Sequence, residues 1–180
     1  FEAYLKKFGL ADQKSIKALS RGMRMKLSLA AALAHRPKLL LLDEATAGLD
    51  PVVRDEILDE FLDFACDEQH SILISSHITS DLEKAADYIA YLHQGKLLLC
   101  EEKDCLLEKY GRLACSEAEL SAVDASLLVG VRRGRFSCEA LVKNRALFAA
   151  AYPHLAVEGV GLDDIMVFIN RAEKEREAEV

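Results

Sequence analysis

The chain has 180 residues, of which 51% are hydrophobic and 29% are charged, and its net charge at pH 7 is −7. This composition excludes a disordered chain and suffices for one sizeable core, or for one core with a small appended domain. The acidic balance argues against general nucleic-acid binding, no apolar run is long enough to cross a bilayer, and the N-terminus lacks the pattern of a secretory signal.

The first part of the chain predicts two helices and then a strand. Apolar residues recur at helical spacing over 1–18, with Gly9 as the stop, and a second helix is expected from the N-cap Ser20 to about His35. The apolar run 39–42 is typical of a central parallel strand that is covered on both faces.

The next segment continues the alternation of strands and helices. A third helix is predicted from Asp50 as its N-cap, with Pro51 at the first helical position. A buried strand over 71–75 follows, and then a short helix that opens with the capping box Ser80–Glu83. The alternation over 37–88 implies a parallel sheet with helical crossovers.

The last part is expected to form a small α+β appendage. Two short strands over 89–93 and 96–100 surround Gln94-Gly95, which is a hairpin signal. The remaining prediction is a helix over 103–110, weak short strands mixed with helices near 117–122 and 144–151, and a final helix over 162–171 before a charged tail.

The cysteines indicate a reducing compartment. There are five, an odd number, and no Cys-x-x-Cys pair occurs. This pattern predicts reduced thiols in a cytosolic protein, and neither a disulfide framework nor a zinc site. Apolar neighbours in the sequence lead us to expect that Cys66, Cys100 and Cys138 are buried.

Three side chains at the ends of the predicted strands have the chemistry of phosphoryl transfer. Asp43 would direct a carboxylate out of the carboxyl edge of the sheet, where α/β proteins bind ligands, and could hold magnesium. Glu44 faces another direction and can accept a proton from an attacking water. His77 ends the neighbouring strand and can hydrogen-bond a γ-phosphate. The alternative is that all three are ordinary strand ends, solvated or satisfied by the backbone.

A phosphate-binding helix end is predicted at Ser20, Arg21 and Gly22. Free backbone amides and the helix dipole favour phosphate at such an end, and Gly22 lets the backbone approach a ligand closely. Asp50, which follows the Gly48 loop, has a structural role as an N-cap whatever else it does.

Four motifs agree in order and spacing with those of ATP-binding cassette (ABC) ATPases. LSRGM, LLLLDEAT, AGLD and SSH resemble the signature motif, the Walker B strand, the D-loop and the H-loop. The resemblance covers about residues 1–110 and is strongest to nucleotide-binding subunits of bacterial export systems. It implies an α/β fold, the C-terminal part of a P-loop NTPase with a parallel sheet, plus the small α+β appendage. We expect a partial ATPase domain over 1–102 and an accessory region over 103–180.

The resemblance implies a role for each candidate residue. Asp43 would be the magnesium-associated Walker B aspartate, Glu44 the catalytic base, and His77 the γ-phosphate switch. Asp50 would be the D-loop aspartate, which communicates between two subunits.

The signature residues would act on a neighbouring subunit. Ser20 and Gly22 would contact ATP held by the opposite subunit, because members of the family sandwich two ATP molecules between head-to-tail subunits. The usual LSGGQ is altered here: Arg21 replaces the first glycine and adds positive charge near the phosphates, and Met23 replaces the glutamine. Ala45 stands where proline is usual.

One motif of the family does not occur in these residues. There is no G-x-x-x-x-G-K-[ST] stretch, and the only Gly-Lys pair, Gly95-Lys96, lies in the predicted hairpin. The aromatic adenine contact and the glutamine loop of the family are also missing, and in the family all three precede the signature motif. Since the first residue is Phe1, we expect the C-terminal portion of a cassette ATPase, which by itself binds ATP weakly or not at all.

The function implied by the resemblance is an ATP-hydrolysing subunit of an ABC transporter of exporter type, with ATP and Mg²⁺ as cofactors. It would act at the cytoplasmic face of the membrane, with membrane-spanning permease subunits and a second ATP-binding subunit as partners and without nucleic acid. Two alternatives stay open: a non-transport ABC ATPase, and a non-catalytic regulatory partner of an intact ABC subunit.

Overall fold

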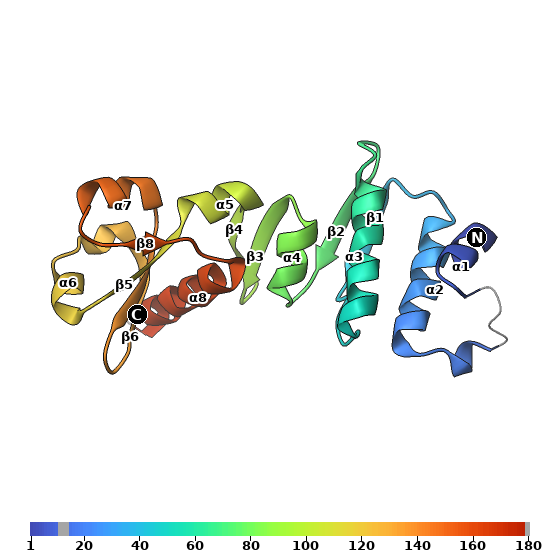
Figure 1. Cartoon of the computed structure of the whole chain (residues 1–180), viewed down its shortest axis with the longest axis horizontal. Coiled ribbons are helices and arrows are strands. Elements are labelled where there is room, and N and C mark those ends of the chain that lie inside the picture. The colour runs from blue at the N-terminus through green and yellow to red at the C-terminus, as the bar shows by residue number, and fades with distance from the viewer. Residues whose placement is uncertain (11–14, 179–180) are drawn as a thin grey trace. The chain divides into compact units, whose positions relative to one another are not determined.

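The chain folds as two compact units, Phe1–Ala85 and Ala86–Val180, in a computed structural model that describes residues 1–10 and 15–178 (Figure 1). The first unit is helical with one parallel strand pair, and the second contains only antiparallel strand pairs among the described residues. The division between residues 102 and 103 that the sequence suggests stays a prediction.

Two helices of the first unit, α2 and α3, begin where the capping residues predict. The elements are α1 (Glu2–Lys7), the short 3₁₀ turn η1 (Ile16–Ala18), α2 (Arg21–Leu33), α3 (Pro51–Ala65) and α4 (Thr79–Ala85). The Ser20 hydroxyl accepts a hydrogen bond from the Met23 amide at 3.2 Å, and Asp50 Oδ1 accepts one from the Val53 amide at 3.1 Å. Both predicted N-caps are therefore confirmed, because each satisfies an amide that the helix leaves unpaired.

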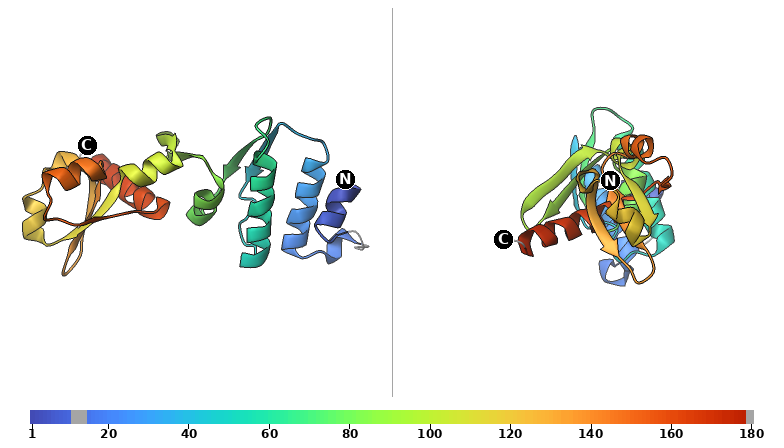
Figure 2. Two further views of the ribbon diagram at one scale, coloured as in Figure 1. Left: turned by 45° about the horizontal axis from the view of Figure 1, so that its top comes forward. Right: turned by 90° about the vertical axis from the view of Figure 1, so that its left-hand side faces the viewer.

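A parallel strand pair joins these helices. β1 (Leu39–Asp43) pairs in register with β2 (Ser71–Ser75), and α3 forms the crossover between them. The predicted parallel pairing is confirmed. Figures 1 and 2 show α2 and α3 side by side within this unit.

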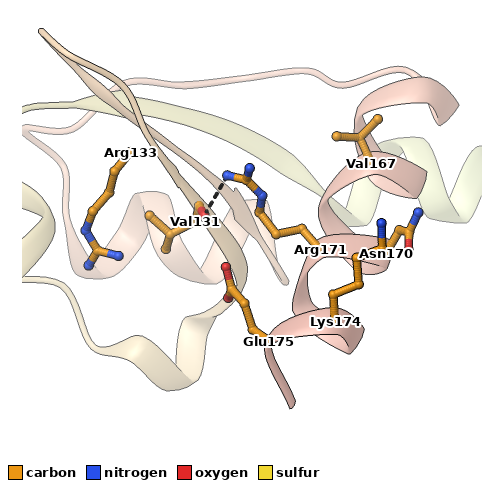
Figure 3. Close-up of a pocket in the computed structure, with 7 residues that line it drawn as sticks. All are labelled: Val131, Arg133, Val167, Asn170, Arg171, Lys174 and Glu175. Atoms are coloured by element: carbon orange, nitrogen blue, oxygen red, sulfur yellow. Dashed lines mark hydrogen bonds between the residues drawn. The ribbon is translucent and has the colours of Figure 1, made fainter. Parts of the chain in front are cut away.

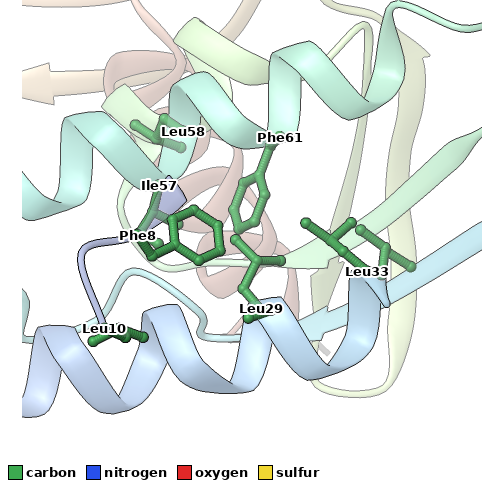
Figure 4. Close-up of a cluster of buried hydrophobic side chains, with 9 residues drawn as sticks. Phe8, Leu10, Leu29, Leu33, Ile57, Leu58 and Phe61 are labelled. Carbon is green, nitrogen blue, oxygen red and sulfur yellow. The ribbon is translucent and has the colours of Figure 1, made fainter. Parts of the chain in front are cut away.

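The core of the first unit lies between the helices and one face of this strand pair. Leu40 is buried, and Leu42, Ile72 and Ile74 pack against the same cluster. Figure 4 shows the cluster between α2 and α3, with the C-terminal end of α1 and the residues after it inserted. Its labelled members are Phe8, Leu10, Leu29, Leu33, Ile57, Leu58 and Phe61.

The opposite face of the strand pair is open in the described structure. Leu41 is 69% exposed and Leu73 is 66% exposed, and Leu39 beside them is exposed as well. The expectation that this apolar strand is covered on both faces is therefore not met. Successive side chains of a strand point to opposite faces, and the first-unit core occupies only one of them.

The second unit begins with the predicted hairpin. β3 (Tyr88–His93) and β4 (Lys96–Glu102) pair antiparallel, and the turn residues Gln94 and Gly95 have φ values of 47° and 76°. Two positive φ angles in a two-residue loop match the right-handed twist of the strands. Helix α5 (Lys103–Lys109) follows and ends before Gly111, as expected.

A four-stranded antiparallel sheet completes the second unit and confirms the α+β prediction. Its strand order is β6-β7-β5-β8. The final helix packs on β6 so closely that a Cβ on Gly130 would lie 2.9 Å from the Phe168 carbonyl oxygen. The elements are β5 (Gly111–Cys115), α6 (Glu117–Ser121), the 3₁₀ turn η2 (Ala125–Leu127), β6 (Leu128–Arg133), β7 (Cys138–Val142), α7 (Arg145–Ala151), β8 (Val157–Glu158) and α8 (Leu162–Ala178).

Three local expectations need correction. Cys66 and Cys100 are exposed, and only Cys138 of the three is buried as predicted. Helix α4 begins at Thr79, so Ser80 lies inside its first turn and its hydroxyl accepts from Arg54 at 2.6 Å. A complete capping box occurs instead at Ser116 and Glu119, at the start of α6.

Within the part of the chain that is described, no helix combines the length and the apolar character that a bilayer crossing requires.

Candidate functional site

The carboxyl ends of β1 and β2 bring Asp43 and Ser75 together. These residues are directly opposite in the parallel register, and the Ser75 hydroxyl donates a short hydrogen bond to Asp43 Oδ1. The Ser75 hydroxyl oxygen also accepts from the Glu44 amide at 3.2 Å, and the Ser75 carbonyl accepts from the same amide at 3.1 Å. Ser75 therefore fixes the main chain between the two acidic residues, a role that the sequence did not reveal although the SSH motif contains this serine.

Glu44 leaves the strand in an unusual backbone conformation. Its φ angle is 48°, in the left-handed region that non-glycine residues seldom occupy. Such a conformation costs about 1–2 kcal/mol and persists only where the surroundings hold it. The Ser75 hydroxyl and carbonyl, which both accept from the Glu44 amide, help to hold this turn.

His77 contacts the carboxylate of Glu44. His77 Nδ1 lies 2.6 Å from Glu44 Oε2, and the two side chains are 70% and 41% exposed. A contact between two such exposed side chains contributes little to folding stability. At these exposures both side chains are accessible to a ligand. The structure brings Asp43, Glu44 and His77 to one edge of the strand pair, as the sequence predicts.

A buried polar network holds the segments that carry these residues. Asp81, at the start of α4, is 1% exposed and Thr46, in the loop after Glu44, is fully buried. Asp81 Oδ2 accepts from the Thr46 hydroxyl at 2.5 Å, and Asp81 Oδ1 accepts from Arg54 Nε at 2.5 Å. The network thus ties the loop after β1 to the helix that follows His77 and to α3. Sequence reasoning missed it: Thr46 ends the LLLLDEAT motif but was given no role there, and Asp81 and Arg54 belong to no motif that was considered.

The helix end at Ser20 lies against the loop that contains Gly48. Gly48 has a φ angle of 66°, and a Cβ there would lie 2.5 Å from Arg21 Nη1. A Cβ on Gly22 would lie 2.8 Å from Val53 Cγ1, so the missing side chain of Gly22 makes room for α3. Ser20 and Arg21 are exposed and Gly22 is buried.

Two groups of predicted site residues therefore form within the first unit. Asp43, Glu44 and His77 form the first. Ser20, Arg21 and Gly22 lie beside the Gly48 loop, where the Asp50 carboxylate caps α3. Ser20 and Asp50 both have a structural role, because a side-chain oxygen of each accepts a hydrogen bond from a backbone amide at the start of a helix.

The donor set at Asp43 fits a magnesium ion that receives most of its ligands from elsewhere. Among residues 1–10 and 15–178, no group of three acidic, histidine or cysteine side chains is close enough to hold a metal ion. Mg²⁺ commonly binds one or two carboxylates and completes its octahedron with water and substrate phosphates. The exposed Asp43 carboxylate at a strand end suits that arrangement and does not form a protein cage.

Comparison with known proteins finds a family match within the first unit. Residues 1–47 match the family described as ABC transporter. Over 102 residues the chain is 43% identical to the lantibiotic transport ATP-binding protein SrtF of Streptococcus pyogenes, a match that covers 56% of this chain and 44% of that protein. Over 86 residues it is 42% identical to the bacitracin transport ATP-binding protein BcrA of Bacillus licheniformis, with 48% of this chain and 28% of that protein covered.

A third relative is similar over a comparable length. The chain is 35% identical over 106 residues to the ABC transporter ATP-binding protein YtrB of Bacillus subtilis, which covers 59% of this chain and 36% of that protein. The chain thus spans less than half the length of these curated relatives. The family match, the relatives and the parallel β1-α3-β2 unit together show that the N-terminal part of this chain is similar to the ATP-binding proteins of ABC transporters, which have a P-loop NTPase fold.

Proposed function

We propose that the complete protein is the ATP-hydrolysing subunit of an ABC transporter of exporter type, and that this chain supplies the Walker B, D-loop, H-loop and signature elements. The phosphate-cradling P-loop would come from residues outside these 180. The observation that carries the proposal is the contact of 2.6 Å between His77 and Glu44 beside Asp43, at the carboxyl ends of two parallel strands.

Glu44 is the proposed general base. Its carboxylate is exposed, belongs to a residue with a positive φ angle directly after β1, and can accept a proton from a water that attacks the terminal phosphate. A positioned base contributes typically about 10²–10⁴ to the rate. In this proposal the bond to His77 holds the carboxylate in one orientation.

His77 can connect Glu44 to the phosphate. A neutral ring that donates from Nδ1 to Glu44 has only an acceptor at Nε2, whereas an imidazolium donates from both nitrogens. The charged ring can therefore donate to Glu44 through Nδ1 and to a γ-phosphate oxygen through Nε2. This geometry supports the role of a sensor of the terminal phosphate.

Asp43 is the proposed protein ligand of magnesium. The Ser75 hydroxyl occupies Oδ1, which leaves Oδ2 as the oxygen for the ion or for one of its water ligands. When bound, the ion neutralises charge that develops on the phosphates.

The second group would serve the ATP of a neighbouring ATP-binding subunit. Ser20 and Arg21 are exposed at the start of α2, where free amides and the helix dipole favour an anion. The Arg21 side chain contacts the loop at Gly48. A movement of this loop, which leads to Asp50, would therefore displace Arg21 at the start of the signature helix α2. These contacts support a role of the two segments in communication between subunits.

The partners follow from the same proposal. The relatives named for lantibiotic and bacitracin transport favour an export system. We infer membrane-spanning permease subunits and a second ATP-binding subunit as partners, a position at the cytoplasmic face of the membrane, and no nucleic acid.

The test uses the complete protein with its P-loop. Glu44→Gln should lower the kcat for ATP hydrolysis by about 10² or more and leave ATP binding intact. His77→Ala should lower kcat similarly, and the double variant should lose little more, because residues that act as a unit are not additive. Glu68→Gln makes the same change at an exposed position of the same unit and should retain normal turnover. Near-normal hydrolysis by Glu44→Gln would remove Glu44 from its assigned role.

A further inference from the structure

A groove runs between the edge strand β6 and helix α8 in the second unit (Figure 3). Its volume is about 650 Å³, and its walls include Val131 and Arg133 on the strand and Val167, Arg171, Lys174 and Glu175 on the helix. None of these residues belongs to the elements that carry the proposed ATPase chemistry, so the groove would have a function other than ATP hydrolysis.

The strand wall of the groove is the free edge of a sheet. β6 stands at one end of the order β6-β7-β5-β8 and pairs only with β7 among the described strands. An edge strand presents unpaired main-chain groups that can receive another strand. In Figure 3, Arg171 reaches from α8 toward the Val131 carbonyl oxygen, at a distance of 3.5 Å. This distance is at the outer limit of a hydrogen bond, so the contact is weak and can be replaced.

The groove is basic although the whole chain is acidic. Three of its side chains are cationic, Arg133, Arg171 and Lys174, and Glu175 is the single carboxylate in the lining. Arg133 is paired with Glu117 at 3.1 Å, but both side chains are more than half exposed. Because exposed ion pairs contribute little, a carboxylate from a ligand can take the place of Glu117.

The length of the groove favours an extended chain over a compact anion. Its helix wall runs from Val167 to Glu175, which is about 12 Å at the rise of an α-helix. About four residues of an extended strand cover the same distance. Val167 is exposed on the helix wall and supplies apolar contact beside the cationic groups, which suits a segment that carries both apolar and acidic side chains.

We propose that this groove binds an extended acidic segment of a partner protein, which adds to the free edge of β6 and pairs its carboxylates with Arg133, Arg171 and Lys174. Main-chain hydrogen bonds to β6 would provide affinity, and the cations would select acidic over basic sequences. Glu175 opposes the ligand and limits the strength of binding. The accessory region would thereby recruit a partner without contact to nucleotide.

The test measures binding of a fluorescein-labelled octapeptide of alternating valine and glutamate to the 180-residue chain by fluorescence anisotropy. Saturable binding is expected, with an affinity at least tenfold lower for Lys174→Glu and for Arg171→Glu, and two- to fivefold higher for Glu175→Gln. Lys174 is exposed, so its substitution is expected to leave the fold intact even if Arg171→Glu disturbs α8. Lys96→Glu makes the same change of charge in the β3–β4 turn region and should alter the affinity by less than twofold.

Two further probes separate strand addition from simple attraction of anions. The same octapeptide with N-methyl groups on alternate backbone amides should bind at least tenfold more weakly, and the version with lysine for glutamate should not bind. Equal binding of the N-methylated peptide, competition by millimolar inorganic phosphate, or an equal loss in Lys96→Glu would each overturn the proposal. Perturbed amide resonances along β6, with those of β8 unchanged, would support it.

Discussion

His77 Nδ1 and Glu44 Oε2 lie 2.6 Å apart, although the residues are separated by 33 positions in the sequence. The in-register parallel pairing of β1 and β2 creates this proximity, because it aligns Asp43 with Ser75 and lets the following residues of both strands meet. The contact is exposed and adds little to stability, so its value is expected to be chemical.

The first prediction concerns nucleotide affinity. The 180-residue chain has no G-x-x-x-x-G-K-[ST] loop, so the groups that normally cradle the β- and γ-phosphates are missing from its sequence. We expect a Kd for Mg²⁺-ATP of about 1 mM or weaker, or no measurable binding, in isothermal titration calorimetry. Micromolar affinity would contradict the assignment of phosphate binding to residues outside this chain.

The buried network of Asp81 should dominate the stability of the loop after Glu44. Asp81→Asn removes the charge that holds Arg54 Nε and weakens the bond from Thr46. We expect a loss of about 2–3 kcal/mol in the free energy of unfolding by urea, because Arg54 loses its charged partner in a largely buried network. The loss is at the lower end for a broken buried pair, because the Arg54 side chain is 29% exposed and keeps some contact with water. Asp63→Asn changes an exposed carboxylate of the same unit and should hardly move the unfolding midpoint.

The packing of α2 on α3 should depend on the small size of Gly22. A Cβ there would lie 2.8 Å from Val53 Cγ1, so Gly22→Ala overpacks the helix contact although alanine favours a helix. The expected net loss is about 1 kcal/mol in urea unfolding. The double variant with Val53→Ala should recover about 1 kcal/mol relative to the sum of the single effects. Strict additivity would show that the two residues do not meet.

The reactivity of Cys105 should report its neighbour Glu102. The thiol donates to Glu102 Oε2 at 3.6 Å, and this carboxylate raises the pKa of Cys105 above its ordinary value near 9.0. The thiolate fraction at pH 8 is therefore reduced, and alkylation by iodoacetamide should quicken as the pH rises through the raised pKa. Glu102→Gln removes the negative charge and should speed alkylation at pH 8, because the thiolate fraction rises. The exposed Cys66 serves as the internal control in the same mass spectra, and its rate should be the same in both proteins.

Several local features of the fold and of the site could be predicted from short stretches of sequence. Ser20 and Asp50 could be identified as N-caps because a cap bonds to an amide only three residues ahead. The hairpin at Gln94-Gly95 could be predicted because its backbone angles depend on the turn residues themselves. The proximity of Asp43, Glu44 and His77 needed only the further rule that parallel strands end at one edge of a sheet.

Other features depend on residues that are distant in the sequence. The role of Asp81 requires Thr46 and Arg54, which come from two other segments. The burial of Gly22 depends on Val53, and the exposure of Cys66 and Cys100 depends on which faces of their elements receive a neighbour. The capping box at Ser116 and Glu119 is different, because its S-x-x-E signal is local and sequence reasoning passed over it.

The sequence by itself determined the order of helices and strands, the helix caps, the chemical types of the site residues and the similarity to ABC ATPases, because these are properties of neighbouring residues and of motif spacing. Only the tertiary structure decided that Asp43 meets Ser75, that Asp81 is buried with Thr46, and that one face of β1 and β2 is open while β6 borders a basic groove. These features depend on packing and hydrogen bonds between residues that are distant in the sequence, and the hydrophobic pattern of the sequence does not specify which surfaces will meet.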